Sequence, residues 1–337
     1  MIVPSTVLVA LLCTILSMIC WGTWANTFKW SGKWRFELFY YDYAAGVVIA
    51  AVLAAITFGS MGDDLSVYDN FLIAGKMKIL YGLGAGAVFN LANMLLVAAI
   101  SVAGMAVAFP VGIGLALVVG VIWNFILNPQ GNPELLFAGV ALVVCAIIVD
   151  ARAYGLHGEA RGAAAQKTSG KGIALSLVSG LLMGSFYPLV EMGKQGENGL
   201  GPYSIGLVFS VGVFISTFFY NIYFLNLPVE GKPIGMFDYF TGSARQHLLG
   251  IAGGILWCVG AISNFAAASA PPSVQVGPAI SYALGQGATL ISALWGLLYW
   301  KEFAGATVPV KRLIWIMLLL FVVGLAMISV APLFAQA

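Results

Sequence analysis

At the end of the first long apolar run stands Cys20-Trp21-Gly22-Thr23-Trp24-Ala25-Asn26-Thr27-Phe28-Lys29, and a similar stretch, Met183-Gly184-Ser185-Phe186-Tyr187-Pro188-Leu189-Val190-Glu191, ends a run in the second half. Aligned without a gap, the two stretches pair Gly22 with Gly184, Trp24 with Phe186 and Lys29 with Glu191. This similarity predicts an internal repeat. If each half holds an odd number of membrane spans, the second copy lies inverted in the membrane, a construction found in many secondary transporters.

The composition is that of a protein embedded in a lipid bilayer. Of the 337 residues, 61% are hydrophobic and 8% are charged, whereas about a quarter of the residues are charged in a typical soluble domain. A helix needs about 20 apolar residues to cross the hydrocarbon core. Ten runs are long enough, namely 3–25, 39–60, 77–100, 103–127, 134–152, 172–192, 203–226, 247–269, 273–299 and 312–334. A β-barrel would instead show short alternating strands, so we expect α-helices.

We therefore predict an all-α membrane protein with ten transmembrane helices arranged as two inverted five-helix repeats. Residues 1–153 would form the first repeat and residues 172–337 the second. The connection 154–171 is small, polar and charged, which is typical of a linker. Most Lys and Arg residues between the runs follow runs 1, 5, 7 and 9, so the linker is expected to be cytoplasmic and both termini periplasmic, in a bacterial inner membrane.

Several classes of protein do not fit the remaining chemistry. The four cysteines stand singly in apolar runs, and the two histidines lie at or beyond the ends of runs, so we expect no disulfide, metal or other cofactor. There is no cluster of His, Asp, Ser and Cys of the kind an enzyme needs. Gly170-Lys171-Gly172 lacks the first glycine and the Ser or Thr of a phosphate-binding loop. We predict a transporter without a nucleic-acid partner, either ion-coupled or a simple facilitator.

Interrupted segments in corresponding runs indicate where a central cavity lies. Run 4 contains Phe109-Pro110-Val111-Gly112-Ile113-Gly114, and run 9 contains Val276-Gly277-Pro278-Ala279. Proline and glycine inside a span free backbone groups, and matching breaks in two halves point to the substrate site of transporters. Close helix packing is predicted by glycines four apart, at Gly82 and Gly86, Gly180 and Gly184, and Gly250 and Gly254. Run 10 is nearly featureless and is expected to be a peripheral packing or dimerisation helix, with a homodimer as one expected partner.

Aromatic and neutral amide residues inside the runs form the candidate substrate site. An apolar pocket with a few directed polar groups suits a small neutral ligand. Aromatic faces pack against a planar ring or the apolar face of a sugar, and amides both donate and accept hydrogen bonds. The predicted site consists of Trp21, Trp24, Asn90, Asn93, Tyr187, Trp257, Asn264, Tyr282 and Gln286. For Asn90 and Asn93, hydrogen bonding between helices is the alternative role.

Two carboxylates are the candidates for proton coupling. Glu191, at the outer end of run 6, could take up and release a proton if it is buried, and the alternative is an interfacial carboxylate in water. Asp42 opens run 2 at the cytoplasmic edge. It is expected to be solvated, paired with Lys29 or Arg35, or part of an inner gate.

Two further groups at the cytoplasmic edge are expected to have ordinary roles. Tyr40, Tyr41 and Tyr43 are predicted to anchor the chain at the membrane interface, where aromatic residues are enriched. Asp150 is expected to be a solvated cap of run 5 or to pair locally with Arg152.

Four stretches carry a resemblance to a known family. They are Cys20-Trp21-Gly22-Thr23-Trp24, Tyr41-Asp42-Tyr43, the segment 90–99 (NLANMLLVAA) and the segment 108–117 (AFPVGIGLAL). With ten spans in two inverted halves, the chain resembles the drug/metabolite transporter superfamily and, within it, the ureide permeases of plants and their bacterial relatives. The resemblance implies proton-driven import of allantoin, uracil or related oxo-N-heterocycles. The related glucose/ribose and rhamnose uptake families share this architecture, so a sugar is the alternative substrate.

Overall fold

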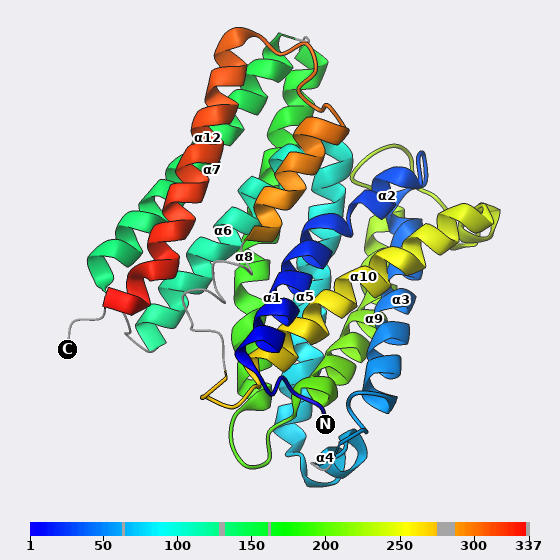
Figure 1. Cartoon of the computed structure of the whole chain (residues 1–337). Helices are drawn as coiled ribbons and strands as arrows, with labels where there is room; N and C mark the ends of the chain where they lie inside the picture. Colours follow the sequence, from blue (N-terminus) through cyan, green and yellow to red (C-terminus); the bar gives the residue numbers. More distant parts are fainter. Residues whose placement is uncertain (63–64, 128–131, 161–162, 275–286, 335–337) are drawn as a thin grey trace. The chain divides into compact units, whose positions relative to one another are not determined.

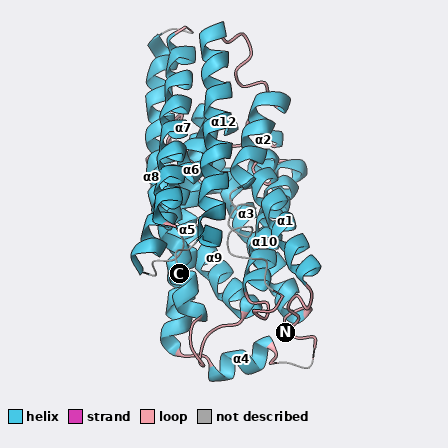
Figure 2. Ribbon diagram, turned by 60° about the vertical axis from the view of Figure 1, so that its left-hand side comes forward, coloured by secondary structure: helices cyan, strands magenta, loops and turns pink. Residues whose placement is uncertain are grey.

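The computed structural model describes residues 1–62, 65–127, 132–160, 163–274 and 287–334. Within these ranges the regular structure is helical (Figures 1 and 2). The elements are α1 (Val7–Thr23), α2 (Asn26–Trp30), α3 (Phe36–Ile56), α4 (Val67–Ile73), α5 (Lys76–Ala103), α6 (Met105–Leu127), α7 (Pro133–Glu159), α8 (Ala163–Lys194), α9 (Pro202–Asn226), the 3-10 helix η1 (Met236–Thr241), α10 (Ala244–Ala268), the π-helix η2 (Trp295–Tyr299), α12 (Val308–Val330) and the 3-10 helix η3 (Ala331–Phe334).

Nine helices in the described part of the chain are long and apolar enough to cross a membrane. They are Val7–Trp30, Phe36–Ile56, Lys76–Ala103, Met105–Trp123, Pro133–Glu159, Gly170–Lys194, Pro202–Asn226, Ala244–Ala268 and Val308–Val330. Each coincides with a predicted run, and the chain is an integral membrane protein. Of run 273–299, residues 275–286 lie outside the described residues, and the rest of the run contains a shorter apolar helix, Gly287–Tyr299. A tenth span therefore stays a prediction.

The chain divides into two compact units that do not follow the order of the sequence. Unit 1 consists of Met1–Met94 and Phe186–Val276, and unit 2 of Leu95–Ser185 and Gly277–Ala337. Each unit takes helices from both sequence halves, and α5 and α8 contribute to both. The inverted repeat, which concerns the order of spans rather than their contacts, stays a prediction.

Helices α3 and α10 approach each other closely in unit 1 because glycine faces backbone on both sides. A Cβ atom on Gly254 would collide with the carbonyl of Tyr43, and one on Gly46 with the carbonyl of Ile251. A Cβ atom on Gly250 would meet the Asp42 side chain. Small residues that admit a neighbouring backbone are typical of membrane helix pairs, so the packing predicted for Gly250 and Gly254 is confirmed.

Glycines that face the backbone of the neighbouring helix also bring α5 and α9 together in unit 1. A Cβ atom on Gly86 would meet the carbonyl of Phe209, and one on Gly212 would meet the carbonyl of Leu83. Gly82 faces the side chain of Val208, whose Cγ1 would lie 2.8 Å from an added Cβ atom. The packing predicted for Gly82 and Gly86 is thus confirmed, and it fixes how the polar residues one turn further along α5 face α9.

Unit 2 is organised around the long contact between α7 and α12. One face of α12 is buried through residues such as Met317 and Phe321, whereas Trp315 and Leu319 on the other face are exposed. Gly139 and Gly324 let the two backbones meet. This is the packing role predicted for run 10.

The predicted linker 154–171 is largely helical rather than a loop. Helix α7 continues to Glu159, and α8 begins at Ala163. Asp150 consequently lies inside α7 and not at its end. Its side chain is 0% exposed, so the prediction of a solvated cap is wrong.

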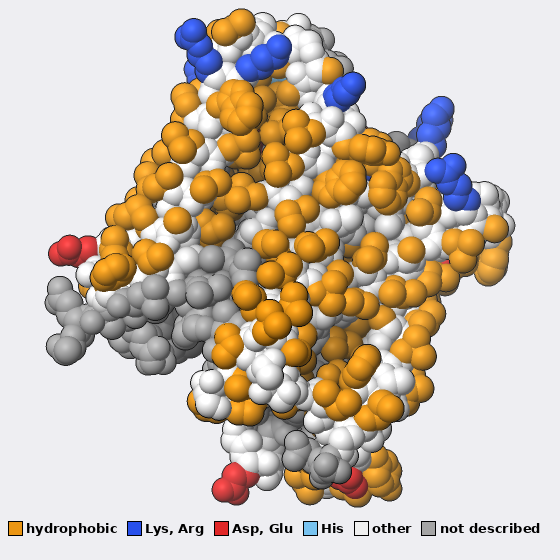
Figure 3. All heavy atoms as spheres, in the orientation of Figure 1, with side chains coloured by type: hydrophobic (Ala, Val, Ile, Leu, Met, Phe, Trp, Pro, Cys, Tyr) orange, Lys and Arg blue, Asp and Glu red, His pale blue; other side chains and the backbone are white. Residues whose placement is uncertain are grey.

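Charges mark the ends of the helices. Figure 3 shows Lys and Arg side chains gathered at one end of the helices in each unit, with most of the visible Asp and Glu side chains toward the other end. Between them the visible surface is largely apolar. Exposed apolar side chains of the described residues include Leu12, Leu53, Ile222 and Leu319. Lipid-facing helix surfaces have this pattern, and the Lys and Arg bias is what the positive-inside rule uses to orient a chain.

Candidate functional site

The predicted site residues that the structure describes all lie in unit 1. They come from α1, α3, α5, α8 and α10. Tyr282 and Gln286 fall outside the described residues. Several of the remaining side chains belong to an aromatic cluster around Trp257, an amide and tyrosine cluster around Asn93, or a polar cluster around Asp42.

Trp257 is the centre of the aromatic cluster. Its ring lies 4.2 Å from that of Phe89 and 5.7 Å from that of Phe209, measured between centroids. Trp21 stacks on it at 6.1 Å with an interplanar angle of 23° and donates from Nε1 to the Trp257 carbonyl at 3.2 Å. Offset aromatic pairs of this kind are favourable beyond the area they bury. The structure therefore brings two of the predicted residues, Trp21 and Trp257, together, and adds Phe89 and Phe209, which the sequence did not single out.

Asn93 is the centre of a second, polar cluster. Its side-chain amide donates to the hydroxyls of Tyr40 at 3.0 Å and Tyr43 at 3.1 Å. Both tyrosines are 0% exposed, so the prediction that they anchor at the membrane interface is wrong. Trp24 packs on Tyr43 with a centroid distance of 4.9 Å. Tyr40 and Tyr43 are three residues apart on one face of α3, and this spacing was the signal that could have identified them as a pair.

Asn90 holds α5 to α9. Its side-chain amide donates to three groups of α9, which are the carbonyl of Val213 at 3.0 Å and the hydroxyls of Ser216 at 2.8 Å and Thr217 at 3.0 Å. The alternative role, hydrogen bonding between helices, is therefore confirmed for Asn90. Its Oδ1 is buried and has no partner among the described residues. A buried acceptor of this kind is uncommon in folded proteins, and it leaves one carbonyl in the cluster unused.

Tyr187 and Asn264, like Trp21, are partly exposed members of the predicted site. Tyr187 follows Phe186 on α8 with a centroid distance of 6.1 Å, and Phe186 in turn packs edge-on against Phe89 at 5.3 Å. Pro188, one residue further, lies inside α8. Proline lacks an N–H group and disturbs the preceding turn. The turn that carries Phe186 and Tyr187 is therefore less regular than the rest of the helix.

Asp42 is buried, with 3% of its surface exposed, and is held by one residue of η1 and one of α10. The hydroxyl of Tyr239 donates to Oδ1 at 2.5 Å, and Nδ1 of His247 lies 2.8 Å from Oδ2. The expectation of a solvated carboxylate is therefore wrong. Tyr239 belongs to η1, outside the membrane-spanning helices, and its pKa is raised by burial and by the hydrogen bond to the Asp42 carboxylate. Neither Tyr239 nor His247 was predicted as a site residue.

Two other carboxylates in unit 1 differ in burial. The side chain of Glu37 is 0% exposed and forms a bidentate ion pair with Arg35, at 2.7 and 3.1 Å. The side chain of Glu191 is 38% exposed and lies 3.2 Å from Lys194. Arg35 thus pairs with Glu37 rather than with Asp42, and Glu191 lies at a partly exposed helix end.

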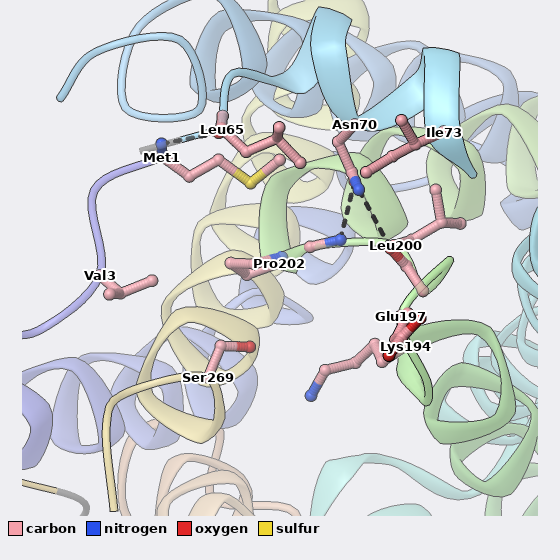
Figure 4. Close-up of a pocket in the computed structure, with 12 residues that line it drawn as sticks. Met1, Val3, Leu65, Asn70, Ile73, Lys194, Glu197, Leu200, Pro202 and Ser269 are labelled. Atoms are coloured by element: carbon pink, nitrogen blue, oxygen red, sulfur yellow. Dashed lines mark hydrogen bonds between the residues drawn. The ribbon is translucent and has the colours of Figure 1, made fainter. Parts of the chain in front are cut away.

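Unit 1 also has a pocket of about 360 Å³ at the ends of α4, α8 and α10 (Figure 4). Asn70 lines this pocket, and its side chain donates to the Gly199 carbonyl at 3.0 Å and accepts from the Gly201 N–H at 2.9 Å. The Lys194 side chain extends into it, with Ser269 across from it. None of the predicted substrate residues lines this pocket.

Comparison with known proteins gives consistent matches. The ureide permease family model matches residues 39–171. Ureide permease 2 of Arabidopsis thaliana is 22% identical over 396 residues, covering 95% of this chain and 96% of that protein. Ureide permease 5 of the same plant is 23% identical, covering 95% and 93%. Over most of its length the chain is similar to ureide permeases. These relatives are named as permeases, which are transporters and not enzymes.

Two further matches extend the comparison. A probable ureide permease A3 of Vigna unguiculata is 28% identical over 148 residues, which is 42% of this chain and 39% of that protein. A crystal structure of a protein with 17% sequence identity superposes with a TM-score of 0.53, covering 94% of this chain and 95% of its own. At this identity the superposition shows a shared fold alone. The segment matched by the family model contains Asp42, Asn90, Asn93 and Asp150.

Proposed function

We propose that this protein imports a small, neutral oxo-N-heterocycle, a ureide such as allantoin or a related ring such as uracil, across a membrane. The observation that supports this best is the match to ureide permeases along 95% of the chain, together with a site built from aromatic rings and neutral amides. Such rings carry flat faces and an edge of alternating carbonyl and N–H groups. Stacking and amide hydrogen bonds are the chemistry that recognises them.

In this proposal the substrate ring packs against the aromatic rings of Trp21, Trp24, Tyr187 and Trp257, and amides form hydrogen bonds with its carbonyl and N–H groups. Asn93 contributes with Tyr40 and Tyr43, whose hydroxyls it already orients. Asn264 and, outside the described residues, Tyr282 and Gln286 would complete the site. Alternating access would expose this site to each side of the membrane in turn.

Proton coupling is the second part of the proposal, and burial favours Asp42 over Glu191 as its carrier. A carboxylate that binds and releases a proton within a transport cycle must alternate between a state with its hydrogen-bond partners and a state without them. Asp42 is buried against Tyr239 and His247, whereas Glu191 is partly in water beside Lys194.

The substrate class is tested by thermal unfolding of the purified protein in detergent with allantoin, uracil, xanthine, glucose and rhamnose. A ligand at 100 times its Kd stabilises the folded protein by about 2.7 kcal/mol. Stabilisation by the ring compounds alone supports the proposal. Stabilisation by a sugar alone would favour the alternative, a sugar transporter of the glucose, ribose or rhamnose type, in which Trp21 and Trp257 would pack against the apolar face of a sugar rather than a planar ring.

Residue roles are tested with the ligand that the screen identifies. Asn93→Ala and Gln286→Ala are each expected to weaken binding by about 1–3 kcal/mol, the cost of leaving a buried polar group without its partner. Wild-type affinity would remove either residue from the site. For coupling, Asp42→Asn should abolish the dependence of uptake on a pH gradient. Glu191→Gln is the matched comparison, and unchanged pH dependence in that variant would eliminate Glu191 as a carrier.

A further inference from the structure

Asp150 is a buried carboxyl group that lacks a partner in unit 2. It lies on α7, is 0% exposed, and neither Oδ1 nor Oδ2 accepts a hydrogen bond from the described residues. Buried side-chain oxygens nearly always have a partner. A carboxylate buried without hydrogen bonds or an opposite charge is among the most costly groups a protein can contain. The group therefore needs a bound cation to balance it.

A nearby carboxylate, Glu302, makes a negative charge on Asp150 more costly still. Glu302, in the segment before α12, acts on it electrostatically. The Glu302 carboxylate is itself fixed in place, because it accepts from the N–H groups of Met105 at 2.9 Å and Ala106 at 2.7 Å, at the first turn of α6. A carboxylate at a helix N-terminus is a favourable arrangement, so Glu302 keeps its place beside α6.

No protein cation balances Asp150 in the described part of unit 2. The Lys and Arg residues of α7, of α12, of the segment before α12 and of the described side chains of α8 in unit 2 are exposed, namely Arg152, Lys171, Lys301, Lys311 and Arg312. Helix α6 contributes no titratable residue. Helix α7 also carries Tyr154, whose hydroxyl donates to the Val102 carbonyl at 3.2 Å, and His157, whose ring packs 5.3 Å from that of Phe303.

We propose that Asp150 is a proton-binding site, occupied as the neutral carboxylic acid in this structure, with Glu302 as the neighbouring negative charge that favours occupancy. A proton fits the site better than a metal ion. Hard metal ions take six or more oxygen ligands, and the described residues contain no group of three or more His, Cys, Asp or Glu side chains that could hold a metal. That this proton is exchanged during transport is an extension that rests on the proposed function.

Infrared spectroscopy of the purified protein, without substrate, tests the site itself. The carbonyl stretch of a carboxylic acid is separate from the bands of a carboxylate. At neutral pH the wild-type protein is expected to show an acid band that Asp150→Asn loses. Glu134→Gln is the matched control, because Glu134 is an exposed carboxylate in the first turn of the same helix, and it should keep the band. An acid band that is unchanged in Asp150→Asn, or absent from wild type, overturns the proposal.

A labelling experiment covers the case in which Asp150→Asn does not fold. Carbon-13 at the aspartate side-chain carboxyl, introduced into the Asp42→Asn protein, leaves Asp150 as the buried aspartate of the described residues. The acid band must then shift with the label. A band that does not shift belongs to glutamate and overturns the proposal.

Reconstituted vesicles test the role in transport. Asp150→Asn is expected to lose uptake driven by an imposed pH gradient while keeping exchange of internal for external substrate. Wild-type pH-driven uptake in this variant overturns the transport role, and dependence on a sodium gradient overturns the proton as the ligand. Since the infrared experiment needs no substrate, a failure of the proposed function is distinguishable from a failure of the site.

Discussion

Two glycines on α5 should respond oppositely to the same substitution. The three atoms nearest to a Cβ atom on Gly86 would all be backbone of α9, namely the Phe209 carbonyl oxygen, the Val213 nitrogen at 3.0 Å and the Gly212 Cα at 3.1 Å. Backbone cannot rotate away as a side chain can, so Gly86→Ala must move α9. A Cβ atom on Gly84, half a turn earlier on the same helix, would meet nothing within 4 Å.

The expected magnitudes follow from these contacts. Gly84→Ala should be neutral or stabilise the protein by up to about 1 kcal/mol, the gain in helix propensity. Gly86→Ala should cost about 1–3 kcal/mol, as overpacking does. The displacement should also lengthen the hydrogen bond from Asn90 to the Val213 carbonyl, at 3.0 Å in the native protein. Gly86→Ala combined with Asn90→Ala should therefore cost less than the sum of the two single changes.

Reversible unfolding in detergent, followed by tryptophan fluorescence, measures all four proteins. Equal stability of Gly84→Ala and Gly86→Ala would refute the close approach of α5 and α9. Strict additivity of Gly86→Ala and Asn90→Ala would refute the link between that approach and the Asn90 hydrogen bonds.

Three further outcomes can be measured in the same way. Arg35→Gln should lower the free energy of unfolding by about 3–5 kcal/mol, because it leaves the fully buried Glu37 charge without its partner. Lys194→Gln, at the partly exposed pair with Glu191, should lower it by no more than about 1 kcal/mol. Similar losses in the two variants would contradict this. Trp21→Phe should cost roughly 1 kcal/mol by removing the hydrogen bond to the Trp257 carbonyl while keeping the stacked ring, and the absence of any change would show that this bond contributes nothing. Because the pKa of Tyr239 is raised in the folded protein, its neutral hydroxyl contributes stability below about pH 10, the ordinary tyrosine pKa. That stability is lost as the pH rises through the higher pKa of the folded protein. Above about pH 10, Tyr239→Phe should therefore lose less stability than wild type.

Local sequence was enough to predict the spans but not the partners of their polar residues. Long apolar runs are visible in any single segment, and nine of the predicted runs are matched by helices of the described residues. Asp42, in contrast, bonds to His247, which is 205 positions away. Nothing near Asp42 in the chain distinguishes a solvated carboxylate from one held in this way.

Buried tyrosines and the position of Asp150 were missed for different reasons. An interfacial tyrosine and a buried tyrosine look the same in sequence, and only the Asn93 amide, from another helix, identifies Tyr40 and Tyr43 as buried. Asp150 was placed at a helix end because polar residues follow it. The helix continues through those residues to Glu159, which moves Asp150 into the interior.

The acceptor for the first turn of α6 comes from Glu302, 197 positions after Met105. At synthesis rates of about 5–20 residues per second, that carboxylate reaches the membrane roughly 10–40 s after the turn it completes. Through that interval α6 exists without its final N-terminal acceptor. Unit 2 therefore acquires its finished form only when nearly the whole chain has been made, and a defect at Glu302 should reduce the yield of assembled protein during biosynthesis.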